Sequence, residues 1–436
     1  MSTVLIYTSP ARGHLYPMLD IAAELIGAGH RVVVQTLADE ANAVTSVGAE
    51  HRPISPAIEA LPLEDYRHAG QAGQLRATMD AWSRRAPLEV DDLRAADAET
   101  APDLFVIDVN AWGAATFAES RGRPWASFLP YVLPVPSRDA PAFGPGFAPP
   151  AHALDRLRDR VVWAGLGQLQ KPYLARLDAL RAELGVPPVR RHARLVLRAP
   201  LLLHRTAEPF EYPRSDLPAN VLQIGPGLWS PAAERPAWLD ALPRPRVLVS
   251  VSTERQDDGA IVAAALKGLA DEPGSLIVPP AAVDPSRFEA PHDRVRIERF
   301  VPHAQVVPEV DVVVTHGGMG TTQRALAAGV PVCVVPWGRD QAETARRAER
   351  SGAGVTLPKA KLTPDALREA VRRARTLTSG AQRVAEAFER AGGARRALAA
   401  LEGLLGGATT DAPAAAVPTV AGRRPGVSVS ASRPAD

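Results

Sequence analysis

Short apolar segments rich in β-branched residues alternate with longer helical patterns along most of this 436-residue chain. Apolar runs without polar alternation predict parallel strands that helices cover on both faces. The alternation breaks at a proline-rich stretch and then starts again, which predicts two such domains with a ligand cleft between them. The expected strands are 4–8, 31–37, 103–108 and 125–129 before the break, and 246–252, 275–278, 295–301, 311–315, 331–336 and 354–357 after it.

The fold class expected from this pattern is α/β, with two doubly wound, mostly parallel sheets. We expect a first domain over 1–212, a linker over 213–245, a second domain over 246–381 and a last ordered helical run over 382–405. Residues 406–436 are rich in Ala, Pro, Ser, Thr and Gly and poor in large apolar side chains, so we expect a disordered tail there.

Composition argues against several classes of function. No run of about 18 uncharged apolar residues occurs, so we expect no membrane span. The chain enters its first strand without a basic leader, and its one cysteine, Cys333, allows neither an internal disulfide nor a Cys-based metal cluster, so we expect a cytoplasmic protein. The net charge is +2 without a basic stripe, so nucleic acid is not an expected partner.

The segment 9–17 joins the first expected strand to the first expected helix and contains His14. A loop in this position, at the carboxyl end of a parallel sheet, faces the cleft. Pro17 suits a first helical turn, so we expect His14 on the loop just before the helix. An imidazole titrates near neutrality, so His14 could act as a general base for a hydroxyl, or it could simply bond a nearby carbonyl group.

A glycine-rich turn follows the apolar run 311–315 and precedes a helical pattern. Such a turn presents backbone N–H groups and the positive end of a helix to a phosphate. Its residues are His316, Gly317, Gly318, Gly320, Thr321 and Thr322. The alternative is a turn that only packs a helix against a strand, but the histidine and the two hydroxyls favour an anion site.

Several other ligand signatures are absent from the sequence. It has no G-x-G-x-x-G fingerprint, no Walker A motif and no D-x-D triplet. We therefore expect no metal and no bound cofactor, with the charge of a diphosphate met by a helix end, a histidine and hydroxyl groups.

These segments together resemble the UDP-glycosyltransferase family, including its antibiotic-pathway members from actinobacteria, over about residues 1–400. The residues that carry the resemblance are Gly13, His14 and Pro17, then Phe300–Gln305, Thr315–Thr322, Ala327–Pro331, and Asp340 with Gln341. The resemblance implies a GT-B fold, inversion at the anomeric carbon, and the run 382–405 packing back on the first domain. It implies that His14 deprotonates the acceptor with help from Asp108. The alternative role for Asp108 is that it caps a helix.

The resemblance also implies a donor site for a nucleoside diphosphate sugar, which would be a co-substrate. At the base, Phe300 is expected to stack, with Val301 and His303 beside it. The diphosphate is expected to contact His316, Gly318, Gly320 and Thr321, and Ser252 and Thr253 are expected near phosphate and sugar. Asp340 and Gln341 are expected to contact the sugar hydroxyls. Ser252, where glycine is usual, and Thr344, where asparagine is common, depart from the family pattern.

The main departure is Arg324, at the position where the family usually has a glutamate that accepts hydrogen bonds from both ribose hydroxyls. A guanidinium group cannot accept a hydrogen bond. Arg324 would therefore fit a thymidine diphosphate donor, whose deoxyribose lacks one of these hydroxyls; a second alternative is that Arg324 contacts a phosphate instead. The third alternative is an arginine that points into solvent.

The acceptor is expected to be a small, flat, apolar natural product bound by the first domain. Candidate contacts are Tyr16, Trp112, Tyr131, Phe143 and Phe147, with Trp82, Trp163 and Tyr173 more remote. The last three candidates of the first group lie in the Pro- and Gly-rich segment 130–150, which is too long for a simple connector and is expected to form a pocket wall or lid. Aromatic residues in such domains also serve as core. A nucleotide-sugar epimerase or hydrolase and a catalytically silent nucleotide-binding homologue remain the alternatives, while O- versus C-transfer and the oligomeric state stay open.

Overall fold

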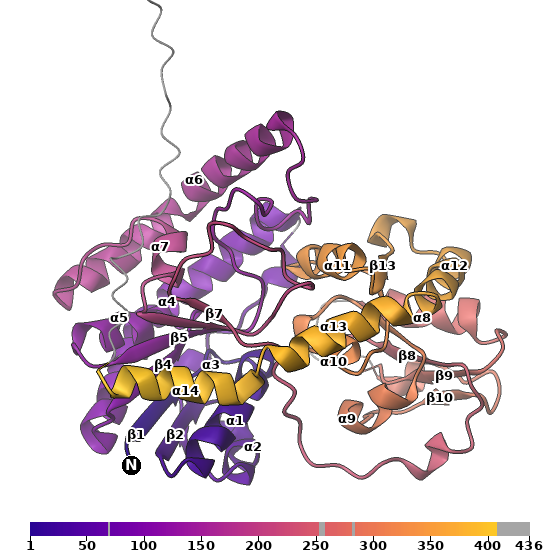
Figure 1. Cartoon of the computed structure of the whole chain (residues 1–436), viewed down its shortest axis with the longest axis horizontal. Helices are drawn as coiled ribbons and strands as arrows, with labels where there is room; N and C mark the ends of the chain where they lie inside the picture. The colour runs from indigo at the N-terminus through magenta and orange to yellow at the C-terminus, as the bar shows by residue number, and fades with distance from the viewer. Residues whose placement is uncertain (69, 253–257, 281–283, 408–436) are drawn as a thin grey trace, which may run out of the picture.

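The computed structural model of the chain describes residues 1–68, 70–252, 258–280 and 284–407. They form two lobes, each built on one parallel β-sheet (Figure 1). We call the part built on the first sheet the N-terminal lobe and the part built on the second sheet the C-terminal lobe. The expected α/β fold with two doubly wound sheets is confirmed.

Both sheets are parallel throughout. The first has the order β3-β2-β1-β4-β5-β6-β7, with β1 (Thr3–Tyr7), β2 (Arg31–Thr36), β3 (Glu50–Pro53), β4 (Leu104–Asp108), β5 (Trp125–Leu129), β6 (Leu201–His204) and β7 (Val221–Gln223). The second has the order β10-β9-β8-β11-β12-β13, with β8 (Arg246–Ser250), β9 (Ser275–Val278), β10 (Val295–Ile297), β11 (Val312–Thr315), β12 (Val332–Val334) and β13 (Gly354–Thr356). The strand order reverses between β1 and β4 and between β8 and β11, which is where such sheets bind ligands.

Most helices lie between these strands in the chain, and α12 to α14 follow the last strand. Those of the N-terminal lobe are α1 (Arg12–Gly27), α2 (Ala41–Ser46), α3 (Pro56–Glu59), α4 (Gly70–Thr100), α5 (Trp112–Ser120), α6 (Ala153–Glu183) and α7 (His192–Val196), with the 3₁₀ turn η2 (Asp65–Arg67) before α4. Those that follow are α8 (Gly259–Leu269), α9 (His303–Val306), α10 (Met319–Ala327), α11 (Gln341–Arg350), α12 (Pro364–Arg375), α13 (Thr378–Arg390) and α14 (Gly393–Leu405).

Alternate residues of the central strand β1 enter two different cores. Val4 and Ile6 pack with α1 and α14 on one face of the sheet. Leu5 and Tyr7 pack with α4 and α5 on the other. Because successive side chains of a strand point to opposite faces, a strand that is apolar at every position needs helices on both sides. The apolar runs of the sequence therefore predicted these layers correctly.

The last helical run, 382–405, is two helices rather than one. α13 packs on α10 in the C-terminal lobe, whereas α14 packs on α1 in the N-terminal lobe. Figure 1 shows the two helices in yellow, running from one lobe to the other. Gly392 separates them with φ 84°, a left-handed conformation that glycine adopts without steric cost.

The linker expected over 213–245 begins too early. β7 lies inside this stretch and pairs with β6 as the edge strand of the first sheet. Its three residues stand among prolines, so the segment is too short to show a strand pattern of its own. The connection between the two sheets therefore begins after Gln223.

Close packing of α4 on α5 depends on a glycine. A Cβ atom at Gly113 would lie 1.8 Å from the carbonyl oxygen of Ala86, whereas one at Gly165, inside α6, would meet no atom within 4 Å. Gly113→Ala should lower the free energy of unfolding by roughly 1–3 kcal/mol, since it forces the two helices apart. Gly165→Ala, the matched control, should raise it by about 0.5–1 kcal/mol. Urea unfolding of the two variants measures both effects, and an unchanged stability of Gly113→Ala would contradict this packing.

Candidate active site

His14 and Asp108 meet at the carboxyl edge of the first sheet. The His14 Nδ1 atom lies 2.6 Å from Asp108 Oδ2, and the side chains are 18% and 0% exposed. Asp108 ends β4, and His14 follows the neighbouring strand β1. His14 stands in the first turn of α1 rather than on the loop before it, because the Ala11 carbonyl already accepts from the amides of His14 and Leu15.

The Asp108 carboxylate is fixed by further donors. Ser9 Oγ donates to Oδ2 at 3.2 Å, and the Asn110 amide donates to Oδ1 at 2.8 Å. The alternative that Asp108 caps a helix is not what the structure shows, since the N-cap of α5 is Ala111. Because a carboxylate only accepts, the proton of a neutral His14 belongs on Nδ1, which leaves a lone pair on Nε2.

Asn110 and Tyr131 face that second nitrogen. Asn110 Nδ2 lies 3.4 Å from His14 Nε2, and Tyr131 Oη donates to Asn110 Oδ1 at 2.8 Å. The rings of Tyr131 and His14 have centroids 5.9 Å apart. Burial, together with the Asp108 and Asp340 carboxylates, raises the pKa of Tyr131 well above its ordinary value, so its hydroxyl remains a donor. Sequence reasoning missed Asn110, although its place two residues after Asp108 was a usable signal.

Glu89 is a second carboxyl group behind the pair and was also missed. It lies on α4, is 1% exposed, and accepts from the Gly113 amide at 2.8 Å at the start of α5. Burial raises the pKa of Glu89 to about 8, and the charge of Asp108 acts in the same direction. At neutral pH Glu89 is therefore mainly protonated, and it adds little negative charge behind the His14–Asp108 pair.

The predicted anion site lies at the carboxyl edge of the second sheet. His316 follows β11 and is 7% exposed, with Nδ1 4.0 Å from Asp258 Oδ2. The same Asp258 oxygen accepts from the Ser252 amide at 2.7 Å. A buried aspartate at the start of α8, which sequence reasoning missed, thus connects the segments after β8 and β11. Thr253, expected beside Ser252, lies outside the described residues.

Two glycines let the His316 ring lie against the turn. Gly317 has φ 100°, and a Cβ at Gly318 would lie 2.7 Å from His316 Nε2. α10 begins directly after Gly318 without a side-chain cap, so its first amides can bind an anion. Gly320 is exposed and Thr321 partly exposed at this end, whereas Thr322 is fully buried.

The turn before α11 brings a residue of the C-terminal lobe towards His14. Gln341 Oε1 accepts from the amides of Trp337 and Gly338 at 2.7 and 3.0 Å. Asp340 starts α11 but does not cap it with its side chain. Burial raises the pKa of Asp340, whereas a backbone hydrogen bond, the charge of Arg339 and the His14 imidazole act in the opposite direction.

The residues expected at the nucleobase differ in how far they are exposed to solvent. Phe300 is 69% exposed, Val301 is buried, and His303 is partly buried. Burial, helped by the charge of Arg324, lowers the pKa of His303 to about 4, so this imidazole is neutral at pH 7. Arg324 does not point into solvent, because its Nη2 donates to the carbonyls of Leu228 and Trp229, both at 2.9 Å.

Of the aromatic residues expected to bind an acceptor, only Tyr131 is shown beside His14 and Asp108. Trp112 is fully buried in a core with Trp82 and His192, so its assignment to an acceptor surface is wrong. The first helical position of α5 turns its side chain inwards. The other three pack elsewhere: Tyr16 edge-on against Trp229, Phe143 on the core of the C-terminal lobe, and Phe147 under Arg158.

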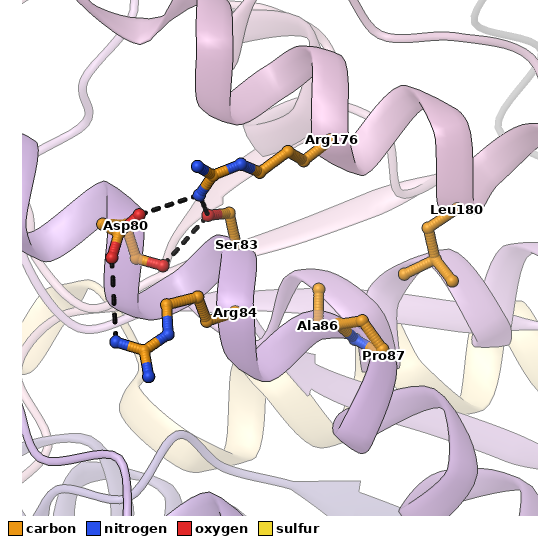
Figure 2. A pocket seen from close by; sticks show the side chains of 7 residues that line it. All are labelled: Asp80, Ser83, Arg84, Ala86, Pro87, Arg176 and Leu180. Atoms are coloured by element: carbon orange, nitrogen blue, oxygen red, sulfur yellow. Dashed lines mark hydrogen bonds and ion pairs between the residues drawn. The ribbon is translucent and has the colours of Figure 1, made fainter.

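A groove between α4 and α6 is separate from this constellation (Figure 2). Its charged residues are paired with each other, since Asp80 accepts from Arg176 at 2.8 Å and lies 3.8 Å from Arg84. The described residues contain no group of His, Cys, Asp and Glu side chains arranged to hold a metal ion. Among the helices of that same part of the chain, none is both long and apolar enough to cross a membrane.

The fold and the site together define a glycosyltransferase of GT-B architecture. A 4'-demethylrebeccamycin synthase of Lentzea aerocolonigenes is 34% identical over 85% of this chain and 90% of its own length. Residues 265–391 match the family described as erythromycin biosynthesis protein CIII-like, C-terminal domain. The chain belongs to the antibiotic-type glycosyltransferases that its motifs indicated.

Solved structures agree with this assignment. The glycosyltransferase of kitacinnamycin has a TM-score of 0.73 and 27% identity, with 92% of this chain and 98% of that chain covered. The glycosyltransferase VinC in complex with dTDP has a TM-score of 0.65 and 22% identity, with 93% and 99% covered. The second likeness is one of fold alone.

The His14–Asp108 contact generates a prediction. Asp108→Asn should lower kcat by roughly 10³- to 10⁴-fold, because an amide can hold the imidazole in the wrong tautomer and cannot stabilise its charged form. Its affinity for a nucleoside diphosphate should stay unchanged. The control is Asp103→Asn, near the start of β4, where the side chain only accepts from the Thr3 amide. Steady-state kinetics that leave Asp108→Asn within a few-fold of wild type would rule out the assisted base.

Proposed function

We propose that this glycosyltransferase is inverting and metal-independent, and that it moves a sugar from a nucleoside diphosphate to a hydroxyl of a small hydrophobic natural product. The observation that carries the proposal is the 2.6 Å contact between His14 Nδ1 and Asp108 Oδ2. It leaves the Nε2 lone pair of a partly exposed histidine at the carboxyl edge of the sheet, where an acceptor can reach it.

In the proposed reaction His14 Nε2 takes the proton of the acceptor hydroxyl while its oxygen attacks the anomeric carbon. The bond from that carbon to the diphosphate oxygen breaks, and the diphosphate leaves with the electron pair. A single displacement of this kind inverts the anomeric centre. Asp108 stabilises the imidazolium that forms, since a buried carboxylate 2.6 Å away interacts strongly with a positive ring.

The leaving diphosphate needs positive charge at the other side of the cleft. The first turn of α10 supplies backbone N–H groups and the positive end of the helix. His316 stands immediately before that turn and can donate a hydrogen bond. These groups, together with the absence of a D-x-D triplet in the sequence, support stabilisation without a divalent cation.

The donor is proposed to carry thymidine rather than uridine. Arg324 holds two backbone carbonyls and cannot accept hydrogen bonds from ribose hydroxyls. Loss of that acceptor penalises a deoxyribose less than a ribose. VinC, which has the same fold, was crystallised with dTDP. Asp340 and Gln341 are proposed to contact hydroxyls of the transferred sugar.

The experiment that tests the function incubates the protein with UDP-glucose or dTDP-glucose and a panel of phenolic and macrolide acceptors, in the presence of a chelator. Acceptor-plus-hexose masses are the expected result, with loss of product in His14→Ala. Transfer that requires an added divalent cation would contradict the metal-independent mechanism. Nucleotide binding without any product from a broad donor panel would favour the silent homologue.

Donor choice is tested by competition binding of UDP against dTDP. The expected result is tighter binding of dTDP by about 2- to 10-fold. This ratio corresponds to the free energy of the one hydrogen bond that the ribose hydroxyl of UDP would lack. Arg324→Glu restores an acceptor at this position and should reduce or reverse that preference. Equal or tighter binding of UDP by the wild-type protein would contradict the thymidine donor.

A further inference from the structure

An ion pair between the lobes holds the turn that leads into α11. Arg339 donates from Nε to Asp65 Oδ2 and from Nη2 to Asp65 Oδ1, both at 2.8 Å. Asp65 lies in η2 of the N-terminal lobe and is 1% exposed, whereas Arg339 belongs to the C-terminal lobe. A pair with two parallel hydrogen bonds constrains orientation as well as distance.

The backbone of Arg339 shows that the turn is held in an unfavourable conformation. Its φ is 52°, in the left-handed region, where a side chain crowds the following carbonyl oxygen. The turn is held from inside by Gln341, which accepts from two of its amides. It is bordered from outside by the N-terminal lobe, since a Cβ at Gly338 would lie 3.2 Å from Gln74 Oε1.

Asp340 follows Arg339 directly at the start of α11, and its carboxylate is the group proposed to contact the sugar hydroxyls. A change in the Arg339 backbone would move this carboxylate directly, because the two residues share a peptide plane.

A second contact between the lobes involves Glu343, in the first turn of α11. Glu343 Oε1 accepts from the amides of Gly144 and Gly146 at 2.9 and 3.0 Å. These glycines belong to the segment 130–150, which was expected to be a pocket wall or lid. Two segments of the N-terminal lobe thus contact the start of α11. Their partners, Arg339 and Glu343, lie before and after Asp340 in the chain.

We infer that Asp65 is a positioning residue for the donor sugar, acting through Arg339 on the placement of Asp340. The inference rests on the proposed function, because it concerns the sugar of the same nucleotide donor. Asp65 lies outside every motif that marks the donor site in the sequence. Through Asp65, the N-terminal lobe would influence how a sugar donor is recognised in the C-terminal lobe.

The test separates the sugar from its nucleotide. In Asp65→Asn, kcat/KM for the nucleotide sugar should fall roughly 10- to 100-fold, because the partly exposed Arg339 loses the buried carboxylate that holds it. The Kd for the free nucleoside diphosphate should stay within twofold of wild type. A purely structural role would weaken both ligands together, or neither.

A double-mutant cycle and a control complete the experiment. Arg339→Gln should resemble Asp65→Asn, and the double variant should lose no more than either single variant, because both remove one interaction. Asp80→Asn breaks a pair of the N-terminal lobe with Arg176, in the groove of Figure 2, and should change neither ligand. Circular dichroism and thermal unfolding confirm that each variant is folded.

The outcomes distinguish this inference from the proposed function. Wild-type transfer together with an unchanged kcat/KM in Asp65→Asn would overturn the inference alone. Equal losses for the nucleotide sugar and the free nucleoside diphosphate would also overturn it. Failure of the wild-type protein to transfer a sugar from any nucleotide donor would overturn both.

Discussion

The reversal of strand order in each sheet is the constraint on which the rest of the structure depends. Because a right-handed crossover places the helices that follow β1 and β4 on opposite faces, the sheet edge between these strands stays open. His14 and Asp108 follow and end these two strands, so their meeting is a consequence of topology. The same relation between β8 and β11 brings Ser252 and His316 to one place, with Asp258 between them.

The two edges become one site through contacts between the lobes. Arg347 on α11 is 2% exposed, and its Nη2 and Nη1 lie 2.8 and 2.9 Å from Glu211 and Glu343. Burial alone would raise the pKa of Glu211, but the charges of Arg347, Arg214 and His204 together outweigh it and lower that pKa to about 2. Buried charges are tolerated when they are paired and hydrogen-bonded, as they are here. Together with the Asp65–Arg339 pair, this network orients α11, which begins directly after Asp340.

Sequence reasoning succeeded where the local structure depends on neighbouring residues. The strand–turn–helix patterns around His14 and around His316 were readable because apolar runs, glycines and a helix start follow each other within a few residues. It failed where a side chain's environment comes from elsewhere. Trp112 was expected in a pocket but is core, since α4 and α7 cover it. Asn110, Glu89 and Asp258 were missed because a single polar residue carries no pattern, and β7 because three residues among prolines show no period.

The sequence by itself determined the class of fold, the two loops that carry the site, and the His–Asp pair as a candidate, since strand periodicity and glycine-rich turns are local properties of the chain. Only the tertiary structure decided that Arg324 binds the carbonyls of Leu228 and Trp229 and that Asp65 holds Arg339, partners separated by 274 positions. It also decided that the segment 130–150 docks on α11 through Glu343. The physical reason is that hydrogen bonds and ion pairs act over a few ångströms, so their partners are set by how the lobes lie against each other and not by spacing in the sequence.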